Sequence, residues 1–136
     1  MKDQLCRLAT EMMARAYAPY SGYRVGAALL AASGTVYTGC NIENAAYTPT
    51  VCAERVAFFK AVSAGEREFV AIAVAGGKEA PAQEGFPPCG VCRQVMAEFC
   101  APDFKIYTVT QQGALCYTLG QLLPEAFGPA DLGVKE

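Results

Sequence analysis

The sequence predicts an α/β protein, in which a mixed sheet of about five strands lies between helices as a three-layer α-β-α sandwich. Segments with helical periodicity alternate with short apolar segments of strand length. Glycine and proline separate these segments. The order α-β-β-α-β-α-β-β-α favours a mixed sheet that is covered on both faces. A chain of 136 residues is long enough for one core, so a single domain over residues 1–136 is expected.

In the first half of the chain, residues at helical spacing precede a hairpin. Leu5, Leu8 and Met12 recur every three or four positions and predict the first helix. Ser33-Gly34 predicts a hairpin turn between two strands. The expected elements, in residue numbers, are helices over 3–17, 52–64, 90–100 and 119–123 and strands over 23–32, 35–41, 69–75, 104–110 and 114–117.

In the second half, glycine and proline set the expected ends. Gly65 closes the second helix, and Gly76-Gly77 is expected to stop the third strand. Pro102 ends the third helix and Pro124 follows the fourth. An irregular tail is expected after that point.

The composition excludes several classes of protein. The net charge is −2, and the eleven Lys and Arg residues are scattered, so no basic patch predicts a nucleic-acid partner. No apolar run is long enough to span a bilayer, and the N-terminus lacks an apolar signal core. Seven cysteines without a secretion signal favour the reducing cytoplasm, where cysteines are ligands or core residues. The high hydrophobic content, 53%, favours a subunit interface.

Three cysteines have the spacing of a metal site. Cys52 and the pair Cys89 and Cys92 each open a predicted helix, where a thiol pKa is lowered. Three thiolates leave one tetrahedral position open on a zinc ion, as in a catalytic site. Two alternatives remain: a redox pair formed by Cys89 and Cys92, and a structural zinc site with Cys40 or Cys100 as fourth ligand.

Two charged residues beside Cys52 could act together with that metal, one by proton transfer and one by charge compensation. The chain has no histidine, so a carboxylate must carry protons, and Glu54 is the nearest. Three thiolates outweigh the charge of zinc, and Arg55 could offset the excess. The alternatives are that Glu54 only stabilises the helix dipole and that Arg55 is a solvated surface residue. The remaining cysteines are expected to be small buried core residues; they are Cys6, Cys40, Cys100 and Cys116.

These motifs resemble those of a known enzyme family. Cys52-Ala53-Glu54 followed by Pro88-Cys89-x-x-Cys92 is similar to the zinc signature of the cytidine and deoxycytidylate deaminase family, in its three-cysteine branch. Further segments resemble the small homotetrameric cytidine deaminases, in the same order along nearly the whole chain. They are residues 18–21, 25–29, 39–45, 89–94 and 122–127.

The resemblance implies a role for each matching residue. Cys52, Cys89 and Cys92 would bind one Zn²⁺ per subunit, and Glu54 would shuttle protons. The remaining implied roles concern the substrate and the water. Asn41 and Glu43 would bind the ribose hydroxyls, and Tyr23 stands where the family usually has a phenylalanine near the nucleoside. The backbone near Ala53 and Cys89 could orient the water, and Tyr47 and Phe127 would reach the active site of a neighbouring subunit. Strand geometry also places Asn41 and Glu43 on one side and turns Ile42 to the core.

The implied reaction is the zinc-dependent hydrolytic deamination of cytidine and 2′-deoxycytidine to uridine and 2′-deoxyuridine, with release of ammonia, in pyrimidine salvage. The expected enzyme is a cytoplasmic homotetramer whose sites are completed by neighbouring subunits, without a nucleic-acid or membrane partner. Two alternatives stay open: a deaminase of an aminonucleoside antibiotic of the blasticidin type, and a non-catalytic protein with a structural zinc.

Overall fold

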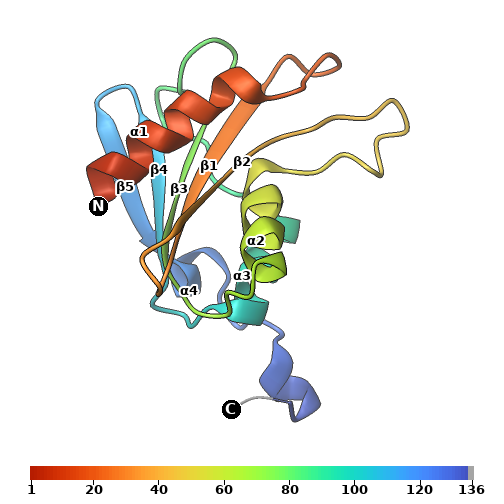
Figure 1. Cartoon of the computed structure of the whole chain (residues 1–136), viewed down its shortest axis with the longest axis vertical. Helices are drawn as coiled ribbons and strands as arrows, with labels where there is room; N and C mark the ends of the chain where they lie inside the picture. The colour runs from red at the N-terminus through yellow and green to blue at the C-terminus, as the bar shows by residue number, and fades with distance from the viewer. Residues whose placement is uncertain (135–136) are drawn as a thin grey trace.

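Residues 1–134 are described by the computed structural model, and they form one five-stranded sheet with helices on both faces (Figure 1). The strands are β1 (Arg24–Ala31), β2 (Val36–Cys40), β3 (Phe69–Gly77), β4 (Lys105–Thr110) and β5 (Gly113–Thr118). The helices are α1 (Lys2–Met12), α2 (Ala53–Ser63), α3 (Gly90–Phe99) and α4 (Leu119–Leu122), with 3₁₀ turns η1 (Met13–Arg15) and η2 (Pro129–Leu132).

The sheet is mixed, as predicted. Its order is β2-β1-β3-β4-β5, and β3 pairs with β4 in parallel while the other pairings are antiparallel. The parallel pair is joined through α3, because parallel neighbours need a crossover connection.

Alternating side chains of the central strands build two cores. On β3, Ile72 and Val74 pack with Phe58 of α2 and Met96 of α3. The alternate residues of β3 are alanines, and they pack with Leu5, Ala9 and Met13 of the N-terminal segment. Helix α1 therefore covers one face and α2 and α3 cover the other, which confirms the three-layer arrangement (Figure 1).

Glycine allows both layers to approach the sheet closely. A Cβ atom added to Gly39 of β2 would lie 2.3 Å from the carbonyl oxygen of Ala53 in α2. A Cβ atom added to Gly26 of β1 would lie 2.0 Å from the carbonyl oxygen of Ala9 in α1. The first turn of α2 is therefore held directly against the edge strand.

Three expectations for the ends of elements were wrong. The first helix, expected to residue 17, ends at Met12 and continues only as η1 to Arg15. Gly76 and Gly77 do not stop β3 but are paired within it, opposite Val25 and Arg24. They are glycines because other groups approach them: the ring of Phe86 lies over Gly76, leaving no room for a Cβ atom. The tail is not wholly irregular, because η2 begins at Pro129. Within residues 1–134, no helix combines the length and apolarity needed to cross a membrane.

Candidate metal centre

Two helices on the same face of the sheet begin at cysteines. Cys52 is the N-cap of α2, and Cys89 is the N-cap of α3. Both have extended backbone angles, so each chain segment turns into its helix at the cysteine itself. Cys92 lies in the first turn of α3 and is buried. The helix dipoles favour negative charge at this point, which suits thiolates.

The three sulfur atoms converge on one point. They lie within 4.8 Å of one another, with 3.7 Å between Cys52 Sγ and Cys89 Sγ and 3.6 Å between Cys89 Sγ and Cys92 Sγ. Sulfur ligands at 2.3 Å from a tetrahedral zinc ion are separated by about 3.8 Å. The spacing therefore fits three corners of a zinc tetrahedron.

The fourth corner has no protein ligand among residues 1–134, since no further Cys, Asp or Glu joins the group. Cys40, one of the two candidates for a fourth ligand, instead donates its thiol to the carbonyl of Arg15 at 3.4 Å. Cys100 also lies outside the group. This donor set resembles an open catalytic site more than a closed structural one.

The thiols share their protons unequally. A hydrogen bond with Cys92 is the main cause that lowers the pKa of Cys52 to about 5, and the Arg55 guanidinium adds to it. The same hydrogen bond with Cys52 raises the pKa of Cys92. A metal cation that binds all three sulfurs must displace the proton held by Cys92, so metal affinity at this site depends on pH.

Glu54 is a buried carboxyl group beside the sulfurs. Its side chain is only 3% exposed, in the first turn of α2. Burial raises the pKa of Glu54 to about 7, and the negative charge of Cys52 adds to the increase. A carboxyl with such a pKa can both accept and release a proton near neutral pH.

Arg55 turns its guanidinium toward the same sulfurs. Its Nη2 donates to Cys52 Sγ at 3.5 Å. The hydrogen bond with the Cys52 thiolate raises the pKa of Arg55 further. Its Nε is buried and has no hydrogen-bond partner among residues 1–134. Arg55 is therefore placed to offset the negative charge of the cysteine thiolates.

Asn41 is buried and holds the start of β1. Its Oδ1 accepts from the backbone N–H of Val25 at 2.8 Å, and its Nδ2 donates to the carbonyl of Tyr23 at 2.9 Å. These bonds use one lone pair and one of the two N–H groups, so one of each remains for a ligand.

Glu43 is fixed by backbone groups far away in the sequence. Its carboxylate accepts from the N–H groups of Tyr20 at 2.9 Å and Ser21 at 3.1 Å, and from the Ser21 hydroxyl. The serine hydrogen bond is the main cause that lowers the pKa of Glu43. Local sequence patterns do not predict that Tyr20 and Ser21 bind this carboxylate, because the contact spans more than twenty positions.

The expectation that Ile42 faces the core was wrong. The side chain is 45% exposed. The reason is that residue 42 lies beyond the end of β2 and is held only by single bridges to Tyr17 and Val51.

Tyr23 lies in an aromatic cluster next to the Asn41 contact. Its ring centroid is 6.1 Å from that of Phe86, and the ammonium of Lys78 is 5.3 Å from the Tyr23 ring. Phe86, which comes just before the Cys89 turn, was not predicted to be near the site. The only sequence feature linked to this ring is the glycine at position 76, where the ring leaves no room for a Cβ atom.

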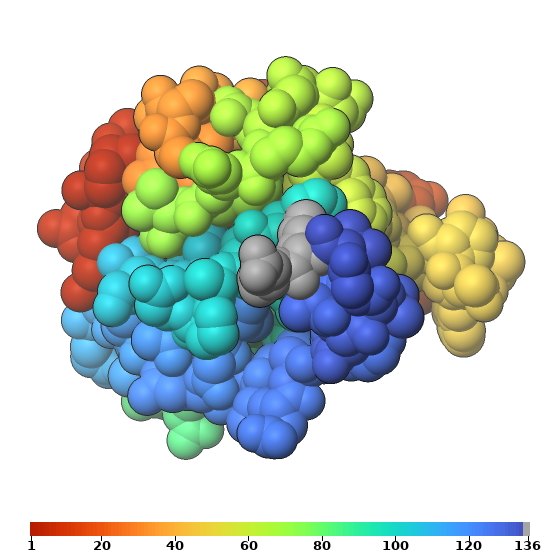
Figure 2. All heavy atoms as spheres, turned by 90° about the horizontal axis from the view of Figure 1, so that it is seen from below, coloured from red at the N-terminus to blue at the C-terminus, as the bar shows by residue number. Residues whose placement is uncertain are grey.

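The segment between β2 and α2 stands out from the body of the molecule (Figure 1), and Figure 2 shows it in yellow on the projecting side. Tyr47 in this segment is 72% exposed and packs edge-on against Tyr20. A cavity of about 330 Å³ lies here, lined in part by Glu43 and Tyr47. Phe127, on the C-terminal segment, is 58% exposed. Within one chain, neither aromatic ring is covered.

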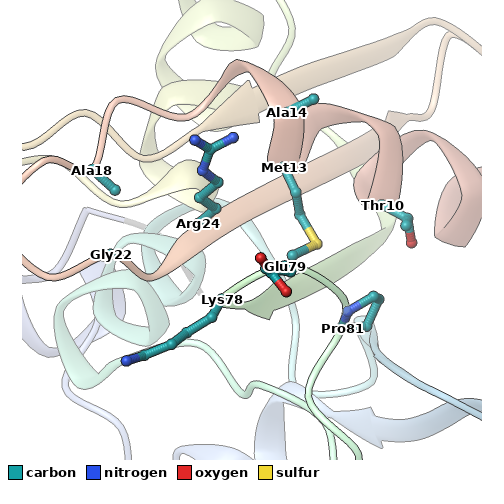
Figure 3. Close-up of a pocket in the computed structure, with 9 residues that line it drawn as sticks. All are labelled: Thr10, Met13, Ala14, Ala18, Gly22, Arg24, Lys78, Glu79 and Pro81. Atoms are coloured by element: carbon teal, nitrogen blue, oxygen red, sulfur yellow. The ribbon is translucent and has the colours of Figure 1, made fainter.

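A roomier cavity of about 740 Å³ lies elsewhere, between η1 and the start of the loop after β3 (Figure 3). Arg24, Lys78 and Glu79 are the charged residues that line it (Figure 3). None of the three clustered cysteines lines this cavity, so the candidate metal centre lies elsewhere, at the cysteine cluster.

The other cysteines follow the prediction only in part. Cys6, Cys40 and Cys100 are half-buried, but Cys116 is exposed. Cys116 lies on β5, the edge strand of the sheet, where no position is fully buried.

The fold and the cluster together define a zinc-binding α/β protein. Residues 1–108 match the family model of the cytidine and deoxycytidylate deaminase zinc-binding region. The chain belongs to this family.

Individual relatives agree over most of the chain. A cytidine deaminase of Sporosarcina psychrophila is 54% identical over 119 residues, covering 87% of this chain and 85% of the relative. A cytidine deaminase of Halalkalibacterium halodurans is 48% identical over 132 residues, covering 96% and 97%. The crystal structure of a cytidine deaminase from Burkholderia pseudomallei superposes with a TM-score of 0.84 at 43% identity, covering 93% of this chain and 99% of that one.

Proposed function

We propose that this chain is a zinc-dependent cytidine deaminase that hydrolyses cytidine and 2′-deoxycytidine to uridine and 2′-deoxyuridine, releasing ammonia. The observation that carries the proposal is the convergence of three sulfur atoms beside the buried carboxyl of Glu54. Cys52, Cys89 and Cys92 would hold one Zn²⁺ per subunit. Zinc in such a site lowers the pKa of water toward about 7 and so supplies a nucleophile at neutral pH.

Glu54 carries the protons of the reaction. It takes a proton from the attacking water and gives it to the ring nitrogen of cytosine, and it then moves the proton of the newly added hydroxyl to the amino group, so that the carbonyl forms and the amine leaves as ammonia. Its raised pKa suits both directions of transfer. The first backbone N–H groups of α2 and α3, near Ala53 and Cys89, have no helical partner and can orient the water or the developing charge.

The nucleoside would be held by side chains that are already fixed. Asn41 retains one N–H group and one lone pair, and Glu43 is preset by its backbone bonds, so both could bind ribose hydroxyls without reordering. The Tyr23 ring would pack beside the nucleoside. Arg55 would offset the excess negative charge of the thiolates.

The exposed aromatic residues support a homotetramer. Tyr47 on the projecting segment and Phe127 on the C-terminal segment would each enter the active site of a neighbouring subunit and exclude water from it. Such an enzyme would act in pyrimidine salvage in the cytoplasm, as one domain over residues 1–136. Light scattering tests the assembly, and a monomer that is fully active would contradict it.

The decisive experiment replaces the proton carrier and keeps the metal ligands. Glu54→Gln should retain zinc and lower kcat at least about 100-fold, measured by the loss of ultraviolet absorbance of cytidine. The matched control is Glu66→Gln, since Glu66 accepts hydrogen bonds from Ser33 and Tyr37 beyond the far end of α2. Activity that persists in Glu54→Gln with normal zinc content would show that the roles are assigned wrongly.

A further inference from the structure

Arg93 lies directly after the ligand Cys92 on α3 and binds two separate parts of the chain. Its Nε donates to the carbonyl of Pro88 at 2.8 Å, and its Nη1 donates to the carbonyl of Leu122 at 2.7 Å. The side chain is half-buried, and both of these partners are backbone carbonyls. The position of Arg93 next to Cys92 in the sequence does not by itself explain these two hydrogen bonds.

Each of these carbonyls lacks a helical partner. Pro88 is fully buried and precedes the N-cap of α3, so its carbonyl lies outside the helix. Leu122 is the last residue of α4, where carbonyls have no N–H group further along the helix. One guanidinium therefore satisfies two carbonyls that would otherwise be costly to bury, and the planar fork of arginine suits two acceptors better than an ammonium does.

The next residue of α3 makes a second connection to the C-terminal segment. Gln94 Nε2 donates to the carbonyl of Phe127 at 2.8 Å. Helices α3 and α4 also lie side by side (Figure 1). The turn that carries Cys89 and Cys92 is therefore braced from the C-terminal side, whereas Cys52 is braced by the contact of α2 with Gly39.

We infer that Arg93 is a positioning residue of the metal centre, which holds the Pro88-Cys89 turn in the geometry that retains zinc by fastening it to the end of α4. The inference rests on the proposed zinc site. Arg93 touches no reacting atom; it acts by keeping Cys89 Sγ at its distance from the other two sulfurs. Without it, the turn can open and the ion is released through Cys89, the exposed member of the three.

The test measures zinc release and not only turnover. Zinc-loaded Arg93→Ala and wild-type proteins are mixed with excess 4-(2-pyridylazo)resorcinol, and the rate of colour formation reports the transfer of zinc. Release should be at least about tenfold faster in Arg93→Ala, with a lower kcat/KM for cytidine per bound zinc. Arg93→Lys, which keeps the charge without the fork, should be intermediate and also serves if Arg93→Ala does not fold.

The matched control is Arg67→Ala. Arg67 Nη1 also donates to two backbone carbonyls, those of Val62 and Glu66, but at the C-terminal end of α2. This variant should leave zinc release unchanged. The inference is overturned if the Arg93 variants only lower the melting temperature while zinc release stays at the wild-type rate. Because zinc release requires no catalysis, this result is separate from failure of the proposed reaction.

Discussion

Substitution of Gly39 by alanine tests how the fold sets the position of α2, the helix that carries Glu54. The added methyl carbon would lie 2.3 Å from the carbonyl oxygen of Ala53 and 2.7 Å from the backbone nitrogen of Ala57. Non-bonded atoms in favourable contact are about 3.5 Å apart. The first turn of α2 must therefore move from β2 by roughly 1 Å, and it carries Cys52 and Glu54 with it.

Two effects of different size are expected from this displacement. Overpacking of this kind costs about 1–3 kcal/mol of folding free energy, which is several degrees in melting temperature for a chain of this length. A shift of about 1 Å in a catalytic group can lower the rate on the order of 100-fold. Gly39→Ala should therefore remain folded near room temperature but lose most of its kcat/KM for cytidine.

The matched control is Gly26→Ala, on the other face of the sheet. Its methyl carbon would lie 2.0 Å from the carbonyl oxygen of Ala9, so it displaces α1, which carries none of the zinc ligands. Thermal unfolding and cytidine turnover per bound zinc are measured for both variants. The reasoning is refuted if Gly39→Ala loses stability but keeps its turnover, or if Gly26→Ala loses as much turnover as Gly39→Ala.

Three further predictions concern single side chains. Cys52→Ala should lose zinc, measured by metal analysis, and all measurable turnover, whereas Cys116→Ala on the exposed edge strand should keep both. Arg55→Gln should retain zinc but lower kcat/KM about tenfold, because the charge of the thiolates is then less well offset. Burial raises the pKa of Cys100 to about 12, so its alkylation, followed by peptide mass spectrometry, should be slow at pH 8 and still rise steeply at about pH 10, while the exposed thiol of Cys116 reacts quickly. A rate for Cys100 that levels off below about pH 10 would contradict this.

Local patterns were sufficient for most of the elements and for the positions of the three cysteines at helix starts. Helical spacing located α1, and the two cysteine motifs predicted helix starts at Cys52 and Cys89, where the structure has them. Spacing could also indicate that Cys89 and Cys92 face one point, because a helix fixes that geometry within four residues. The approach of Cys52 to this pair depends on how β3, which lies between them in the chain, places the two helices on one face of the sheet. The spacing of the three cysteines suggested a shared metal but left a redox pair open, and the family resemblance favoured the shared metal.

Contacts between distant segments explain what could not be predicted. A glycine pair after an apolar run predicts the end of a strand at Gly76. In the structure this glycine is instead required by the ring of Phe86, which lies over it and is ten positions away in the sequence. Alternation alone predicts a core position for Ile42, but alternation carries no information beyond the end of the strand, and β2 ends at Cys40. The two carbonyl partners of Arg93 likewise come from separate elements, so its position next to Cys92 did not reveal them.

The placement of the ligands on two helices also affects how the chain unfolds. Cys52 and Cys89 are 37 positions apart, and their helices begin side by side on one face of the sheet. An ion bound to both sulfurs closes that stretch of chain into a ring, as a disulfide would. By the entropy of loop closure, such a tie restricts the unfolded chain enough to be worth about 4 kcal/mol. The cofactor of this enzyme would therefore also act as a clamp, and its loss would loosen β3, which lies inside the ring.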